Sequence, residues 1–293
     1  MAALPAPAPE PLGGWRASLS LRFAPRDGRT IVADRRHEGP LLIQRAFYPG
    51  DGACHVYLLH PPGGVAGGDT LELDVHACAD AAVLLTTPAA TKIYRARRGA
   101  DLQRALPLGR STVRQSFTVA AGASLEWLPH DTILFGGSRA ALRTHVRLDA
   151  AARFIGWEMT SLGRPLAGDA YAEGTLEQRT RIEIGGRAAL DERAALAAGD
   201  PALDAPWGWA GHRVWGALYA CPADGAALEA ARRRLPPPAA SAMAAATLLG
   251  PLLVVRCLAQ SAERLRVTLE TVWAALREGV VGRPASAPRI WQT

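Results

Sequence analysis

The sequence has a single lysine, Lys92, and no asparagine, although lysine and arginine together number 33. Almost every basic residue is therefore an arginine, and the formal net charge is +6 at pH 7. A basic chain can bind nucleic acid, but these arginines are scattered along the sequence, and the longest run, residues 232–234, ends a predicted helix, where cations suit the helix dipole. The sequence also has no recognisable nucleic-acid recognition motif. Composition therefore argues against RNA or DNA as the partner.

Long hydrophobic runs are also missing. No stretch of about 18 apolar residues could span a membrane, and the N-terminus "MAALPAPAPE" lacks the basic start and apolar segment of a signal peptide. Residues 1–14 are expected to form a disordered, proline-rich tail. The four cysteines contain no C-x-x-C pair, so buried thiols are expected instead of disulfides. These features predict a cytoplasmic protein with no membrane contact.

A glycine-rich stretch, "HPPGGVAGGDT", places Gly63, Gly68 and Thr70 where a phosphate-binding loop would have its glycines and its final threonine. Asp69 stands where that loop needs a lysine. The residues that follow, "TLELDVH", alternate between apolar and polar, which predicts a strand instead of the required helix. The stretch is therefore interpreted as a turn that needs glycine conformations, or as a turn whose carboxylate meets a cation.

Most of the sequence has the pattern of β-strands. Three segments, at 74–85, 117–127 and 146–157, each read as strand, short turn of small residues, strand. Further strands are predicted at 174–184, 188–195, 214–220 and 252–258. Apolar content is 49%, enough for a substantial core. The prediction is a mainly β protein, with an extended, stacked or coiled body of strands that runs to about residue 222 and no separate second domain before residue 293.

Two α-helices are predicted near the C-terminus, within residues 223–280. Asp224 can cap the first, which three prolines close. Ser261 can cap the second, and Gly279 is expected to end it. In the second helix, apolar residues fall on one face at spacings of three and four: Leu265, Leu269, Val272, Trp273 and Leu276.

Residues that could bind a metal or catalyse a reaction do not form a recognised motif. Cys54 and His55 are adjacent and would face opposite sides of a strand, and no closed zinc pattern is present. No G-x-S-x-G elbow occurs. Glu126 and Glu158 could form an acid/base pair, but each lies beside a tryptophan in a predicted strand. The sequence therefore predicts a protein that is not an enzyme and holds no permanent cofactor.

Seven stretches taken together resemble one known family. They are "GPLLIQRAFYP", "CHVYLLHPPGGVAGGD", "LLTTPAATKIYR", "LEWLPHDTILF", "FIGWEMTSLGRP", "PWGWAGHRVWGALYA" and "PRIWQT". In this order, from about residue 39 to residue 293, they resemble the UreD family of urease accessory proteins, called UreH in some organisms. Two departures are minor: Ala89 stands where the family usually has glycine, and His130 replaces a common glutamine.

The resemblance implies a non-catalytic role in urease maturation. Members of the family bind UreF, which recruits the nickel-carrying GTPase UreG, and the assembly docks on the urease apoprotein and inserts nickel. The resemblance also implies a passage for transient Ni²⁺ through the β body, and it is compatible with a dimer within the UreD–UreF–UreG complex. One alternative is a pure interaction scaffold that never contacts nickel; another is a sugar- or nucleotide-binding β protein, which the motifs disfavour.

Candidate residues follow from this hypothesis. Asp69, Glu126, His130 and Asp131 are the candidates for a transient nickel path, because oxygen ligands hold a divalent ion loosely and one imidazole adds selectivity. Their alternative is structural: a turn cap at Asp69, and pairing of Glu126 or Asp131 with an arginine. Leu265, Leu269, Val272, Leu276, Ile290 and Trp291 are the candidates for the UreF interface, with packing on the β body as their alternative.

Overall fold

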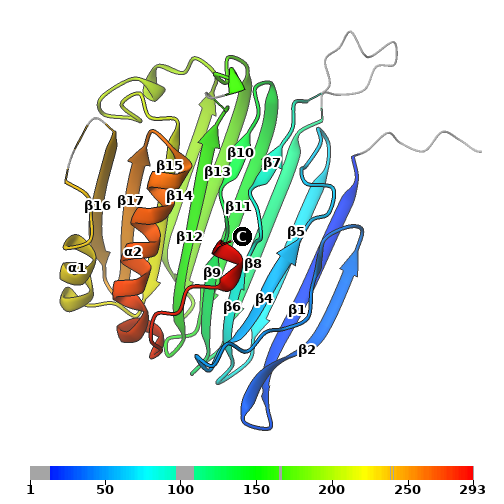
Figure 1. Ribbon diagram of the computed structural model, residues 1–293, viewed down its shortest axis with the longest axis vertical. Helices are drawn as coiled ribbons and strands as arrows, with labels where there is room; N and C mark the ends of the chain where they lie inside the picture. Colours follow the sequence, from blue (N-terminus) through cyan, green and yellow to red (C-terminus); the bar gives the residue numbers. More distant parts are fainter. Residues whose placement is uncertain (1–13, 97–108, 165–166, 238, 240, 293) are drawn as a thin grey trace, which may run out of the picture.

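Two large β-sheets form the body of the protein. The computed structural model describes residues 14–96, 109–164, 167–237, 239 and 241–292. Within these residues, a seven-stranded sheet has the order β14-β13-β11-β8-β5-β1-β2, and a ten-stranded sheet has the order β16-β17-β15-β12-β9-β6-β4-β3, with β10 and β7 beside it. Figure 1 shows the strands running side by side along the molecule. The mainly β fold predicted from the sequence is confirmed.

The strands of the seven-stranded sheet are β1 (Arg16–Arg26), β2 (Arg29–Glu38), β5 (Thr70–Ala77), β8 (Ser111–Val119), β11 (Ser138–Leu148), β13 (Gly174–Ile184) and β14 (Arg187–Ala197). Those of the ten-stranded sheet are β3 (Leu42–Ile43), β4 (Cys54–Leu59), β6 (Ala82–Thr86), β7 (Thr91–Ile93), β9 (Ser124–Leu128), β10 (Thr132–Leu134), β12 (Arg153–Leu162), β15 (Val214–Cys221), β16 (Ala242–Leu249) and β17 (Leu252–Ala259).

The three strand–turn–strand segments of the sequence make the chain coil between the sheets. In each, the first strand (β5, β8 or β11) joins the seven-stranded sheet and the second (β6, β9 or β12) joins the ten-stranded sheet. Successive copies pair in parallel. The turns also stack through backbone bonds: Gly122 N–H donates to Ala151 O at 3.2 Å, and Asp80 N–H donates to Ala121 O at 3.3 Å. The predicted coiled body is thus built by repetition of one short unit.

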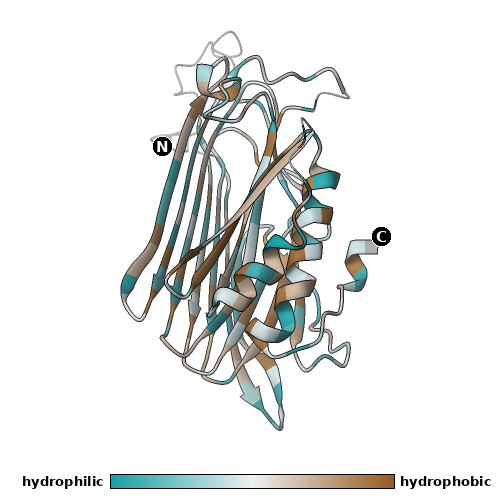
Figure 2. Cartoon of the chain, turned by 90° about the vertical axis from the view of Figure 1, so that its left-hand side faces the viewer, coloured by the Kyte–Doolittle hydropathy of each residue, from teal (hydrophilic) through white to brown (hydrophobic). Residues whose placement is uncertain are grey.

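The main core lies between the sheets. Alternation buries one face of each strand there; β1, for example, contributes Leu19, Leu21 and Phe23. A second core lies between the outer face of the ten-stranded sheet and the helices α1 (Gly225–Arg232) and α2 (Ala262–Val281). Figure 2 shows these helices beside one sheet only. The described part of the chain also contains the 3₁₀ turns η3 (Pro201–Leu203) and η4 (Arg289–Gln292).

Both predicted helices are present with the predicted N-terminal caps. The Asp224 carboxylate accepts from Ala227 N–H at 2.9 Å, and the Ser261 hydroxyl accepts from Arg264 N–H at 3.3 Å. The predicted end of the second helix at Gly279 is wrong. The helix continues to Val281, because Val280 and Val281 are buried, which offsets a cost of about 1 kcal/mol for an interior glycine. It ends at Gly282, whose φ of 71° is left-handed.

Residues 1–13, most of the predicted tail, lie outside the described residues, and the prediction of one domain over residues 15–293 stays a prediction. In the part of the chain that the structure describes, every helix is too short or too polar to cross a membrane.

Candidate functional site

A row of polar side chains crosses the otherwise apolar core between the sheets. In the seven-stranded sheet, Gln115, Thr144, Thr180 and Glu192 lie in register on the neighbouring strands β8, β11, β13 and β14. All four belong to the inward-facing set of their strands, in which most other members are apolar and Ser111, Ser138 and Gln178 are also polar. This row, called the polar rung below, creates a hydrophilic track where the fold alone would require leucine or valine.

Glu158 of β12 faces the polar rung from the opposite sheet. Its carboxylate accepts hydrogen bonds from the hydroxyls of Thr144 and Thr180, the latter at 2.5 Å, and lies 3.4 Å from the Gln178 amide nitrogen. Burial raises the pKa of Glu158, although these three hydrogen bonds act in the opposite direction. Among the described residues, this carboxyl group is held in place by several polar contacts and pairs with no cation.

Glu158 also separates two hollow regions. A cavity of about 190 Å³ lies between the sheets on one side, and Glu158 and Gln178 line it together with His60, Lys92 and other residues. A groove of about 520 Å³ lies on the other side and is lined by the same two residues, by the end of the polar rung at Glu192, and by Trp207, Trp209, Trp215, Tyr219 and Arg256. Each of the two spaces is large enough for several water molecules. The carboxylate of Glu158 therefore lies where the two spaces meet.

The groove end of this track carries an ion pair. Arg256 of β17 donates to the Glu192 carboxylate through Nε at 2.7 Å, and the Tyr219 hydroxyl lies 3.3 Å from the same carboxylate. Burial, followed by the charges of Glu158 and Glu192, raises the pKa of Tyr219 well above its usual value. Glu192 is thus anchored but remains on the wall of the groove.

Two histidines line the cavity end. Burial lowers the pKa of His60, with an opposing effect from Asp69. Burial, and then the charge of Arg266, lowers the pKa of His130 to about 4. Arg266 Nη1 lies 2.9 Å from both ring nitrogens of His130. Neutral imidazole is the form that binds a metal ion, so both rings are in a metal-binding protonation state at neutral pH.

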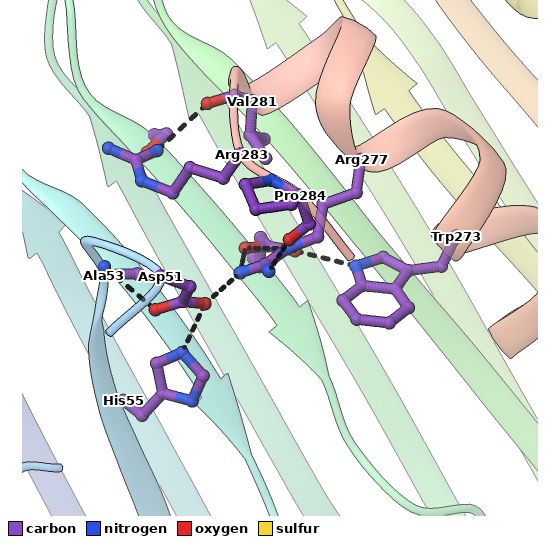
Figure 3. Close-up of polar contacts among 10 residues, drawn as sticks. Asp51, Ala53, His55, Trp273, Arg277, Val281, Arg283 and Pro284 are labelled. Atoms are coloured by element: carbon purple, nitrogen blue, oxygen red, sulfur yellow. Dashed lines mark hydrogen bonds and ion pairs between the residues drawn. The ribbon is translucent and has the colours of Figure 1, made fainter. Parts of the chain in front are cut away.

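Glu126, a predicted nickel-path residue, lies on the other face of the ten-stranded sheet. It is buried under α2, where Arg277 donates to its two oxygens at 2.8 and 3.0 Å and Trp273 Nε1 donates at 2.7 Å (Figure 3). The same guanidinium donates to Asp51 at 2.6 Å, and Asp51 lies 2.9 Å from His55 Nε2. The carboxylate is therefore paired with an arginine, as in the structural alternative.

This buried cluster fixes its own charges. Burial acts to raise the pKa of Asp51, but the hydrogen bonds from His55 and Arg277 lower it well below the usual range. Burial acts to lower the pKa of Arg277, and the contacts with Glu126 and Asp51 raise it instead. Both groups are thus charged throughout the ordinary pH range, and the cluster joins the loop before β4 and the strand β9 to the second helix.

Asp69 closes the glycine-rich loop. One carboxylate oxygen accepts from Trp15 N–H at 2.7 Å and the other from Ala66 N–H at 2.9 Å. The loop leads into the strand β5, so the phosphate-loop interpretation fails, as predicted. Gly14, Gly68 and Gly109 allow backbone segments to approach closely. A Cβ atom on Gly109 would lie 2.6 Å from Gly68, and a Cβ atom on Gly14 would lie 2.0 Å from Gly68. Asp69 has the expected structural role of a turn cap.

Asp131, the last of the four nickel-path candidates, is buried. Its carboxylate accepts from the Ser161 hydroxyl at 2.8 Å, and burial raises its pKa. Only His130 among the four candidates lines the cavity between the sheets. The structure therefore does not bring the four together, and nickel contact at each of them stays a prediction.

The residues predicted to face UreF are also placed. Leu265, Leu269, Val272 and Leu276 are buried in the core beneath α2. Trp291 packs 5.5 Å from Trp157 and 5.4 Å from Trp273, between ring centroids. Ile290 lies beside it in η4. The four helical residues and Trp291 thus pack on the β body, as in the alternative interpretation. A contact with UreF at any of the six residues stays a prediction.

Most of the polar track is not evident from the sequence. From the sequence, Glu158 is a candidate only as an acid/base partner of Glu126, and these two lie on opposite faces of the sheet. No sequence motif marks Gln115, Thr144, Thr180 or Glu192. The available signal was a polar residue at an inward position of an alternating strand, which becomes visible only when the inward face is known.

The polar side chains around Glu158 suit weak binding of a metal ion. Among the described residues, no three His, Cys, Asp or Glu side chains are grouped closely enough to hold a metal ion. A single carboxylate with amide and hydroxyl oxygens around it can bind a divalent ion through water and release it again.

Comparison with known proteins adds independent information. The model of the family described as UreD urease accessory protein matches residues 16–292. A protein named urease accessory protein UreD from Alkalilimnicola ehrlichii is 44% identical over 99% of this chain and 96% of its own length. Proteins of the same name from Pseudomonas entomophila (96% of this chain, 95% of the relative) and Dechloromonas aromatica (99% of each) are 42% and 39% identical.

Proposed function

Because this chain belongs to the UreD family of urease accessory proteins, we propose that it acts in nickel insertion as a non-catalytic scaffold in the cytoplasm. In this proposal it docks on the urease apoprotein together with UreF and UreG, and it holds no permanent cofactor. The nickel ion is cargo, and the energy of GTP hydrolysis is supplied by UreG. The finer question is whether the ion passes through this chain.

The observation that supports a passage is the position of Glu158 between the cavity and the groove. An ion that enters beside His60 and His130 would meet Glu158 next, with the hydroxyls of Thr144 and Thr180 around it. It would leave along the groove, past Glu192. We therefore place the path between the two sheets.

Energetics favour this route over one through Glu126. The desolvation free energy of a divalent ion in an apolar core is far larger than the free energy of folding. The polar rung lowers this cost, because its oxygen atoms can bind the ion weakly. A relay must bind its ion well enough to admit it and weakly enough to release it. Glu126, by contrast, lies outside the space between the two sheets: it is buried under α2 on the other face of the ten-stranded sheet, and Arg277 and Trp273 occupy its carboxylate oxygens. In this proposal His130 remains on the path, while Glu126 keeps a structural role.

The alternative is a pure interaction scaffold, in which nickel passes elsewhere and the polar rung only limits how tightly the sheets pack. The Glu158→Gln variant separates the two. Glutamine retains the size but removes the negative charge. Its one oxygen can accept from one of the two threonine hydroxyls, and its NH₂ group can donate to the oxygen of the other hydroxyl. The matched control is Glu177→Gln, on the same seven-stranded sheet as the rung but exposed and paired with Arg110.

The measurement is the nickel content of urease after activation with the purified assembly, scored beside assembly formation by size-exclusion chromatography. The conduit predicts intact assembly and a loss of nickel incorporation of about tenfold for Glu158→Gln, the lower end of the range for mutation of groups that support a metal site through hydrogen bonds. Full nickel incorporation by this variant would refute the conduit and leave the scaffold.

A further inference from the structure

The outer face of the seven-stranded sheet is a broad polar surface. Both helices pack on the other sheet, so no helix covers this face in the described residues (Figure 2). Its strands are long, and alternate residues of each point outward. In the sequence the arginines look scattered, but strand pairing brings several of them together here.

Four outward-facing arginines form one row across neighbouring strands. Arg114 of β8 is in register with Arg143 of β11, which is in register with Arg179 of β13, which is in register with Arg193 of β14. Adjacent strands lie about 4.8 Å apart, so the four side chains leave the sheet side by side. This row is called the arginine rung below.

The carboxylates on this face neutralise the rung unevenly. At one end, Glu72 accepts from Arg114 at 3.0 Å, and at the other end Asp191 accepts from Arg179 at 2.7 Å. Arg143, between them, is exposed and has no ion pair or hydrogen bond from its side chain to any described residue. Each of the two carboxylates is also shared with a second arginine, Arg16 or Arg193. The centre of the rung therefore carries the least compensated positive charge.

Like charges directly opposite each other in a sheet are destabilising. The rung lowers the stability of the isolated protein, and a carboxylate from outside, placed at Arg143, would relieve the repulsion. An arginine fork binds a carboxylate through two parallel hydrogen bonds, so such a contact also fixes orientation.

We propose that the arginine rung, centred on Arg143, is a docking surface for an acidic protein, and that this protein is the urease apoprotein. The choice of urease rests on the proposed function. The C-terminal segment predicted to face UreF lies on the opposite side of the sandwich, which leaves this face for the other large component of the assembly.

The chemistry of the face favours a protein over a nucleic acid. Its carboxylates lie among the arginines and would repel the continuous phosphate backbone of RNA or DNA. Bases also need aromatic rings for stacking. The only aromatic residues in β1, β5, β8, β11, β13 and β14 are Phe23 and Phe117, and both are buried in the core. A surface of mixed charge with a net positive sign fits a folded partner with exposed Asp and Glu.

The test is the affinity of the full-length protein, in its assembly with UreF and UreG, for purified urease apoprotein. Arg143→Glu reverses the charge at the centre of the rung, and Arg143→Gln only removes it. The control is Arg234→Glu, the same change at an exposed arginine beside α1. Thermal unfolding checks that all three variants fold.

At low salt, Arg143→Glu should weaken binding about tenfold or more and Arg143→Gln by less, because like-charge contact across an interface is strongly unfavourable. The difference from wild type should shrink at high salt, and the control should bind as wild type does. Unchanged affinity and salt dependence for Arg143→Glu would overturn the proposal. So would a wild-type assembly that binds a single-stranded RNA oligonucleotide through Arg143 but binds urease independently of it.

The result of this docking test is independent of the result of the Glu158→Gln test of the conduit. Glu158→Gln should leave urease affinity unchanged, since Glu158 lies inside the sandwich. If nickel transit fails to depend on Glu158 while docking depends on Arg143, the passage is refuted and the docking surface stands; the reverse pattern refutes only the docking surface.

Discussion

Arg277 in α2 and Glu126 in β9 form a buried ion pair across 151 residues of sequence, with the guanidinium Nη2 2.8 Å from the carboxylate oxygen. Neither side chain has appreciable contact with solvent. The pair connects the coiled β body to the C-terminal helix, and Asp51 adds a second carboxylate to the same guanidinium.

Replacing Arg277 should be strongly destabilising. Arg277→Met leaves Glu126 and Asp51 buried without their cation, which costs about 3 to 5 kcal/mol. The measurement is the free energy of unfolding from urea titration. As a control, Arg232→Ala breaks the exposed pair with Glu229 and should cost about 1 kcal/mol or less. Equal effects of the two substitutions would show that the buried pair has no special role in the fold.

His130 should make stability depend on pH. Its pKa is about 4 in the folded protein against 6.5 for an ordinary histidine, so the unfolded chain binds more protons between these values. Stability should therefore fall as the pH drops from 6.5 to 4, by at most about 3 kcal/mol for this group.

The measurement for His130 is the unfolding free energy at several pH values in this window. His130→Gln should remove this part of the pH dependence, while the exposed His37→Gln variant should retain it. If the wild type and His130→Gln have parallel profiles, the imidazole is not held neutral by its surroundings.

Asp69→Asn should act on stability and leave nickel transfer intact. The amide retains one acceptor oxygen but presents an NH₂ group to a backbone N–H, so one of the two loop hydrogen bonds is lost, at a cost of about 1 to 2 kcal/mol. Asp74→Asn, an exposed site on the strand β5 that follows the loop, is the control. A folded Asp69→Asn protein that assembles normally but transfers no nickel would restore Asp69 to the ion path.

Trp291 tests the role of the C-terminal segment. Its indole N–H donates to the Thr86 hydroxyl at 3.0 Å, and its ring packs on two other tryptophans. Trp291→Ala should cost about 2 kcal/mol, within the range for removal of packed aromatic groups that keep some exposure. Trp207→Ala, at a side chain that is 78% exposed, should cost little.

The same Trp291 variant can be assayed for UreF binding by pull-down. If the segment only packs on the sheet, UreF binding should persist wherever the variant is folded. Loss of UreF binding by a folded Trp291→Ala protein, or by a folded chain that ends before residue 288, would place the segment in the interface.

Several features were available from the sequence because they depend on neighbours along the chain. Alternation in "TLELDVH" identified a strand and ruled out a phosphate loop, and the repeated strand–turn–strand unit indicated the coiled body. Asp224 and Ser261 marked helix starts through local capping chemistry. The seven ordered motifs were sufficient for the family, which the comparisons confirm.

Other features depend on which strands become neighbours and on which side of a sheet each residue lies. The second helix ends at Gly282 and not at Gly279, because the burial of Val280 and Val281 outweighs the low helix propensity of Gly279. Glu126 and Glu158, similar in sequence context, lie on opposite faces of the ten-stranded sheet: one is paired with Arg277, and the other lies between two hollow spaces.

The sequence by itself thus determined the mainly β fold, the two helices and the family, since strand period, caps and motifs are local properties. Only the tertiary structure decided that Thr144 and Thr180 meet Glu158, and that Arg143 lies in a row of arginines from separate strands. The physical reason is register: a shift of one residue turns each side chain to the other face of the sheet, and register is set by the packing of the whole sandwich.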